Sequence, residues 1–92
     1  METTLYAYQM SPGKDDLLWF TTSPEDCERA AREQREDMRR ELSEGGVIGA
    51  MAVYRFVFRG LQPFELALVL NGEWSIADIA VVDRTLVAVV AE

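Results

Sequence analysis

Histidine is absent from this chain of 92 residues, and Cys27 is its only cysteine. Without histidine, no Ser–His or Cys–His nucleophile pair can form, and the commonest general base is missing. A single cysteine excludes an internal disulfide and a cysteine-rich metal site. From these absences we expect a protein that is not an enzyme and that uses no cofactor.

Long apolar runs and a targeting segment are also lacking. The longest runs, residues 66–70 and 86–91, are much shorter than the ~20 apolar residues that span a membrane. Residues 1–4 contain no basic segment followed by an apolar stretch, which is the pattern of a signal peptide. We therefore expect a cytoplasmic protein that does not contact a membrane.

Basic residues are in the minority: there are nine Lys and Arg against sixteen Asp and Glu, which gives a net charge of −7. Phosphate backbones are bound by clustered basic side chains, so we expect no direct binding of nucleic acid. A protein partner with a basic surface suits this charge. With 49% apolar and 27% charged residues, the chain has the composition of a folded protein, and its length predicts one domain, residues 1–92.

Two short aromatic segments near the start of the chain predict a hairpin. Residues 5–10 and 17–22 have the composition of strands, and the Ser-Pro-Gly-Lys-Asp-Asp segment between them predicts a turn. Trp19 and Phe20 are adjacent in the second strand and point to opposite faces. One of them is therefore exposed, covered by the loop, or part of an interface.

Residues 47–59 predict a third strand, because Tyr54, Phe56 and Phe58 alternate with Val and Arg side chains. Residues 61–72 are ambiguous. Their alternation and the Asn-Gly pair favour a hairpin, whereas their Leu, Ala and Glu content and the leading proline favour a helix. We favour the short helix.

The last part of the chain, residues 76–92, predicts two more strands. Residues 79–82 and 86–90 are rich in β-branched side chains, and Asp83 and Arg84 between them are predicted to form a tight turn. The predicted fold class is therefore α+β, a small single domain. Its mostly antiparallel sheet of about five strands packs against one long charged helix, in the order strand–strand–helix–strand–(helix)–strand–strand.

The helix predicted over residues 24–44 is the best-defined element. Ser23 is suited to cap it, Pro24 suits its first position, and Gly45 and Gly46 suit its exit. Its apolar stripe consists mostly of small side chains, which predicts a close approach to the sheet and little buried area. The stripe contains Cys27, Ala30, Ala31, Gln34, Met38 and Leu42.

The charged side chains on either side of this stripe separate by sign. One side, here called the acidic flank, consists of Asp26, Glu33, Asp37, Glu41 and Glu44; the other contains Arg32, Arg35 and Arg39. Carboxylates four residues apart lie about 6 Å apart along the helix axis, which resembles the spacing of backbone phosphates. The flank is either a solvated surface held by ion pairs, the commoner role of a charge run, or a binding site for a basic groove.

A second acidic group, Asp15 and Asp16, lies in the predicted turn. Carboxylates can hold Mg²⁺ or Ca²⁺, but neither this turn nor the acidic flank has an enclosing pocket or the glycine of a Ca²⁺ loop. We therefore expect no metal site. Cys27 lies in the first turn of the helix, where neighbouring acids raise the pKa of its thiol, and we expect it to be buried and unreactive.

In length, in its lack of catalytic groups and in its acidic stretches, Asp15-Asp16 and residues 25–44, the sequence resembles the small acidic proteins encoded by phages and mobile elements. Anti-CRISPR inhibitors belong to this group. The resemblance is one of character and carries no motif. It implies a protein that binds an effector complex and blocks its nucleic-acid path or its recruitment, and it places the contact on the acidic flank.

The first hypothesis is a non-enzymatic inhibitor that binds a basic, nucleic-acid-handling protein, such as a CRISPR effector subunit, through Asp15, Asp16 and the acidic flank. The alternative is a structural or accessory domain that homodimerises through its apolar C-terminal strands or the edge at Trp19, with its charge serving solubility only. Charge reversal separates the two. Glu33→Lys with Asp37→Lys abolishes partner binding under the first hypothesis and leaves dimerisation intact under the second.

Overall fold

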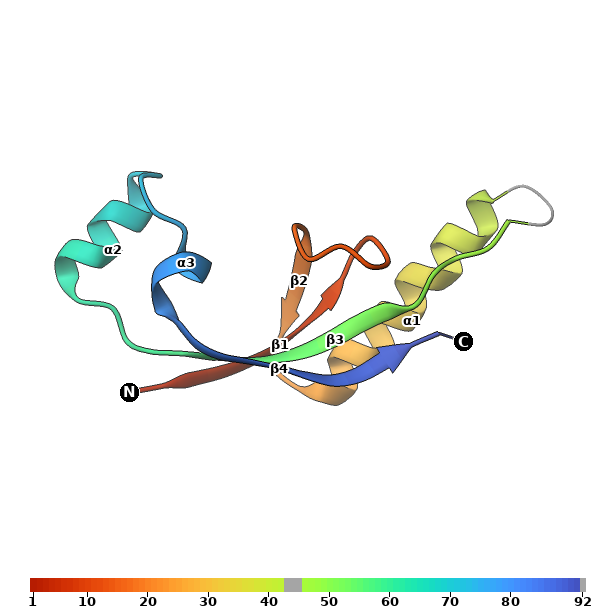
Figure 1. Ribbon diagram of the computed structural model, residues 1–92, viewed down its shortest axis with the longest axis horizontal. Helices are drawn as coiled ribbons and strands as arrows, with labels where there is room; N and C mark the ends of the chain where they lie inside the picture. The colour runs from red at the N-terminus through yellow and green to blue at the C-terminus, as the bar shows by residue number, and fades with distance from the viewer. Residues whose placement is uncertain (43–45, 92) are drawn as a thin grey trace.

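The computed structural model describes residues 1–42 and 46–91 of the chain (Figure 1). These residues form four strands and three helices. In chain order they are β1 (Thr3–Gln9), β2 (Leu18–Thr21), α1 (Pro24–Glu41), β3 (Met51–Phe58), α2 (Pro63–Leu70), α3 (Ile76–Ala80) and β4 (Val81–Val90). The predicted α+β class is confirmed.

The four strands form one sheet in the order β2-β1-β3-β4, and all neighbours are antiparallel. β3 is an inner strand, since β1 and β4 lie on its two sides. Residues of paired strands that are opposite one another share a face of the sheet. Tyr8 therefore lies on the same face as Trp19 and Val53, whereas its chain neighbours Ala7 and Gln9 point to the other face.

The helix α1 begins as predicted, because Ser23 Oγ accepts a hydrogen bond from the Asp26 N–H and Pro24 occupies the first turn. It ends at Glu41, three residues before the expected end at Glu44, and Leu42 already has extended backbone. Glu44 and Gly45 lie outside the described residues. The last helical turn contains Arg39 and Arg40, whose charge complements the negative end of the helix dipole.

Small side chains bring α1 close to the sheet. Cys27 and Ala31 are fully buried against Tyr8, Met51 and Val53, and this cluster forms the main core. The small residues at the centre of the predicted stripe are therefore confirmed as buried, whereas Leu42, predicted at its end, lies beyond α1 and is 41% exposed. Because the stripe is narrow, the stability of the domain depends on a few fully buried side chains of β3.

The expected turn at Asp83 and Arg84 is wrong, and the sheet has four strands rather than five. Both residues lie within β4, where they pair with Val57 and Phe56 of β3. Their charges are accommodated because both side chains are exposed and have partners: Asp83 forms an ion pair with Arg55 at 3.8 Å. Without glycine, proline or asparagine, the Asp-Arg pair does not stop a β-branched run.

The segment before β4 also differs from the prediction. Residues Ile76–Ala80 form the short helix α3 instead of the start of a strand. Ser75 caps this helix, since its Oγ accepts a hydrogen bond of 3.2 Å from the Ala77 N–H. The favoured assignment of residues 61–72 is confirmed, because α2 is a helix that begins at Pro63.

Together, α2 and α3 form an arm (residues 63–80) at one end of the molecule, and Figure 1 shows α2 standing apart from the sheet. The molecule is accordingly elongated, with dimensions of 51 × 24 × 16 Å and a radius of gyration of 15.3 Å. A compact domain of this length has a radius of gyration of about 12 Å. The body of the protein and the arm are thus two distinct parts of one chain.

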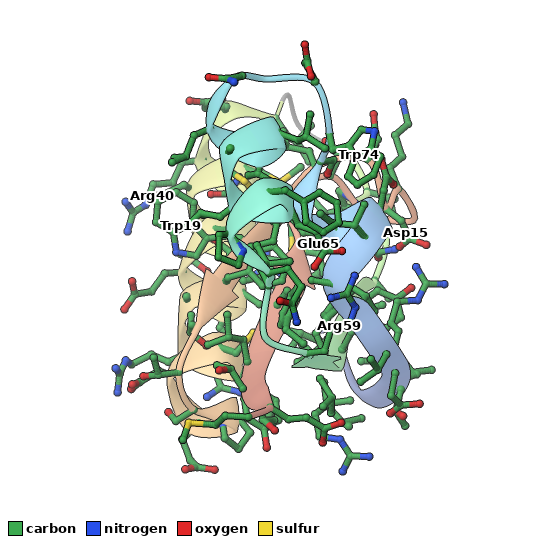
Figure 2. The ribbon with its side chains drawn as sticks, turned by 90° about the vertical axis from the view of Figure 1, so that its left-hand side faces the viewer. Asp15, Trp19, Arg40, Arg59, Glu65 and Trp74 are labelled. Carbon is green, nitrogen blue, oxygen red and sulfur yellow. The ribbon has the colours of Figure 1, made fainter. Side chains whose placement is uncertain are left out.

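A bidentate ion pair attaches the arm to the end of β3. The Arg59 guanidinium donates to both carboxylate oxygens of Glu65, at 2.9 and 2.6 Å, and Figure 2 shows the two side chains pointing toward one another. The Gln62 N–H donates to the same carboxylate at 2.9 Å, and the Arg59 N–H donates to the Ala80 carbonyl. These contacts hold both ends of the arm beside the last residue of the strand.

Because this ion pair needs the ionised carboxylate of Glu65, we expect the attachment of the arm to depend on pH. Hydrogen bonds from Arg59, with that of the Gln62 N–H, lower the pKa of the Glu65 carboxyl from 4.5 to about 2. A lowered pKa stabilises the folded state at pH above the unfolded pKa, and this stabilisation is lost as the pH falls through the folded pKa. We therefore expect the melting temperature, measured by circular dichroism, to fall between pH 4.5 and 2 as this contribution is lost.

Glu65→Gln is the matched variant for this prediction. It should melt at a lower temperature than the wild type at neutral pH, and the difference between the two should shrink as the pH approaches 2. A difference that stays constant over the same range would contradict the role given to the ionised carboxylate.

Candidate functional site

The acidic flank lies on the side of α1 that faces β1 and β2. Burial of the phenol raises the pKa of Tyr8 in β1, and the charges of Cys27 and then Glu33 add to this effect. On the same helix, the Gln34 amide reaches the Met10 carbonyl at 3.5 Å. Because Tyr8 pairs with Trp19 across β1 and β2, the indole of Trp19 lies on the same side of the sheet as the flank.

Two members of the acidic flank are paired with arginines of the same helix. Asp26 forms an ion pair with Arg29, and Asp37 forms one with Arg40 at 3.3 Å. All four side chains are about half exposed or more. Such exposed pairs contribute little to stability. Within residues 1–42 and 46–91, Glu33 and Glu41 form no ion pair, and both are exposed.

The structure places Asp15 away from the acidic flank. Its carboxylate accepts hydrogen bonds from Gln9 Nε2 at 2.7 Å and from the Tyr54 hydroxyl at 2.9 Å, and it forms an ion pair with Arg84 at 3.3 Å. Gln9 and Tyr54 lie on the face of the sheet opposite α1. Figure 2 shows Asp15 on one side of the molecule and Arg40, of α1, on the other.

The hydrogen bonds of Gln9 and Tyr54 lower the pKa of the Asp15 carboxyl, with a smaller contribution from Arg84. The Arg84 guanidinium also lies over the Tyr54 ring, 4.8 Å from its centre. Asp15 therefore connects the β1–β2 loop to β3 and β4. Asp16, its neighbour, is exposed. Asp15 thus lies on the face of the sheet opposite Asp26, Glu33, Asp37 and Glu41, the members of the acidic flank that the structure describes.

Two buried polar residues were not recognised in the sequence as structural. Arg35, expected on the basic side of α1, is only 4% exposed and donates to the carbonyls of Gly49, Ile48 and Ala91. Gln9 is 5% exposed, and its Oε1 accepts from the Gly13 and Ala52 N–H groups. Arg35 follows Cys27 and Ala31 at the four-residue spacing of the buried stripe. A basic residue at this spacing is the sequence signal that could have identified Arg35 as buried.

The Cys27 thiol is fully buried between α1 and the sheet. Burial raises its pKa, the charge of Glu28 adds to this effect, and a hydrogen bond with Thr21 opposes it. A thiol of this kind is a weak nucleophile at neutral pH. The expectation of a buried cysteine is confirmed.

Among the described residues, no three His, Cys, Asp or Glu side chains are grouped so that they could hold a metal ion. No helix in residues 1–42 and 46–91 combines the length and the apolar character that crossing a membrane requires. Searches against protein-family models, curated proteins and solved structures give no match for this chain.

Proposed function

We propose that this is a non-enzymatic cytoplasmic binding protein that uses the acidic flank of α1 to occupy the basic surface of a nucleic-acid-handling protein. The observation that carries the proposal is the row formed by Glu33, Asp37 and Glu41. All three are exposed on one side of a rigid helix, with one helical turn between neighbours. A fixed row of carboxylates at this spacing can take the place of backbone phosphates in a basic groove.

Trp19 supplements this surface with an apolar contact. Its side chain is 54% exposed, although it lies in a strand that contacts α1. Tryptophan is enriched among the residues that contribute most to protein–protein binding, because one side chain buries a large area at little entropic cost. We assign it to the same contact as the acidic flank, and Asp15 to the internal structure of the sheet.

The mode of action that we propose is of the anti-CRISPR type. A partner such as a CRISPR effector subunit has a basic channel for nucleic acid, and the flank would compete with the nucleic acid for that channel. The net charge of −7 steers the protein toward such a surface and away from nucleic acid itself. The exposed ion pairs at Asp26 and Asp37 cost little to open when the partner's own arginines approach.

Charge reversal tests this proposal. We expect Glu33→Lys with Asp37→Lys to abolish capture of a basic partner from an extract of the source cells on the immobilised protein. The wild type should retain the partner, and added duplex DNA should displace it. Retention should also fall steeply between low and high salt, because the contact is between exposed charges.

The matched control reverses two acids elsewhere, Glu2→Lys with Glu73→Lys, and changes the net charge by the same amount. It should capture the partner nearly as well as the wild type. If the control loses the partner to the same degree as the flank variant, net charge rather than the flank determines binding, and the proposed site is wrong. Partner binding that DNA does not reduce would contradict the proposed mode of action.

A further inference from the structure

The arm exposes an apolar surface that its own chain does not cover. Apart from Glu65, every residue of α2 is apolar, and a helix that is apolar on all sides is stable only when it is buried. Phe64 is 62% exposed, Leu66 46% and Leu70 75%. Trp74 and Ile76, which follow α2, are 45% and 47% exposed. Five large apolar side chains exposed within 13 consecutive residues, 64–76, differ from the single scattered ones that are ordinary on a protein surface.

The sheet presents a second uncovered apolar surface, on the face opposite α1. Phe20, Phe56 and Phe58 form a cluster there, with ring centres 5.3 to 6.0 Å apart. Phe56 is buried beneath it, but Phe20 remains 40% exposed. This face ends in an open groove of about 410 Å³ between the sheet and α3, which is lined by Thr3, Leu5, Phe20, Phe58, Arg59, Ile76 and Ala77.

The exposed area of the molecule matches what a dimer would bury. A folded monomer of 10.4 kDa exposes about 5,400 Å². This chain exposes 6180 Å², which is an excess of about 800 Å². Each partner in a protein–protein interface of standard size buries about 800 Å². The excess, which comes with the elongated shape, is therefore as large as one half of such an interface.

The charge distribution allows two copies to approach through these surfaces. Two chains of charge −7 repel one another, but the single acid of α2, Glu65, is neutralised by Arg59. The acidic flank lies on the other side of the sheet. Glu73 and Asp78 belong to the arm but lie after α2. α2 itself and the residues that line the groove thus bring no unpaired acid into the contact with a second copy.

We infer that this chain forms a twofold-symmetric dimer in which α2 of each copy packs into the groove of the other. The arm and the groove belong to the same chain and lie next to each other, because α3 contributes to both. A twofold axis therefore makes both contacts at once and closes the assembly. This contact is independent of the proposed function and leaves the acidic flank of both copies exposed.

Sedimentation equilibrium of the full chain tests the inference. The wild type should have twice the mass of the 10.4 kDa monomer, at low and at high salt alike. Leu66→Lys with Leu70→Lys should raise the dissociation constant of the dimer about 100-fold or more, because two buried leucines are lost. Both side chains are exposed in the single chain, so the variant should keep its far-UV circular dichroism spectrum.

The matched control is Val82→Lys with Val89→Lys, which places the same two charges on exposed positions of the edge strand β4. It should remain dimeric. A wild type that sediments as a monomer would overturn the inference and leave the arm for a different partner. A dimer that is lost in the β4 control but kept in the arm variant would overturn it in favour of pairing between β4 edges.

Cross-linking between different copies provides a second measurement if the arm variant misfolds. Copies with Leu70→Cys are mixed with copies of a different size that carry Thr3→Cys, and a short bismaleimide is added. The native Cys27 is buried and should not react. The inference predicts a covalent product that contains one copy of each kind; products that contain only one kind, or no product, would contradict it.

Discussion

Arg35→Met is expected to lower the free energy of unfolding by about 2–4 kcal/mol, because two or more hydrogen bonds from a charged donor are lost. The guanidinium is 4% exposed and donates to carbonyls at Gly49 and Ile48, before β3, and at Ala91, after β4. Methionine keeps the apolar stem of the side chain and removes its donors. α1 would remain helical and packed on the core, but would lose its hydrogen bonds to the segments before β3 and after β4.

Urea denaturation measures this effect. It is done at one fixed protein concentration, because the inferred dimer would make the stability depend on concentration. Arg32→Met is the matched control, because Arg32 is exposed on the same helix; its effect should stay within about 0.5 kcal/mol. Equal effects of the two substitutions would show that the carbonyl contacts of Arg35 do not stabilise the fold.

Met51→Ala is the second substitution with a large expected effect. Met51 is fully buried beneath α1, where the facing helix residues, Cys27 and Ala31, are too small to fill the space that it would leave. Truncation of a buried methionine to alanine lowers the free energy of unfolding by about 2–5 kcal/mol. Domains of this size have a total stability of about 5–15 kcal/mol, so a large part of it would be lost.

Val89→Ala is the control for this prediction, because Val89 lies in the neighbouring strand and is 56% exposed. Its effect should stay below about 1 kcal/mol. If thermal and urea denaturation gave similar losses for Met51→Ala and Val89→Ala, the assignment of the main core to the α1 side of the sheet would be wrong.

The elements of this fold that depend on local signals could be predicted from the sequence. The Ser-Pro start of α1, the proline at the start of α2 and the aromatic alternation of β3 each act within a few residues. The prediction of two strands in residues 76–92, with a turn at Asp83 and Arg84, was wrong because the outcome there depends on contacts that are not local. Asp83 and Arg84 are held in β4 by side chains of β3 and of the β1–β2 loop, which the local sequence does not reveal.

The candidate site was predictable in part. The acidic flank follows from helical periodicity alone, and its exposed members Glu33, Asp37 and Glu41 lie where the periodicity puts them. The separation of Asp15 from the flank depends on the pleat of β1, which turns Gln9 and its partner Asp15 away from α1. Which face of a sheet a helix covers is decided by tertiary packing, and periodicity does not specify it.

The acidic flank of α1 is the proposed binding site for a basic partner. The most direct test uses the partner that DNA displaces from the immobilised protein. This partner is added to the ¹⁵N-labelled protein, and the changes in the amide signals show which residues it contacts. We expect the largest changes in amide signals at Trp19, Glu33, Asp37 and Glu41, and we expect none of them in the Glu33→Lys, Asp37→Lys variant. Changes confined to Asp16 or to the arm, with the flank unaffected, would contradict it.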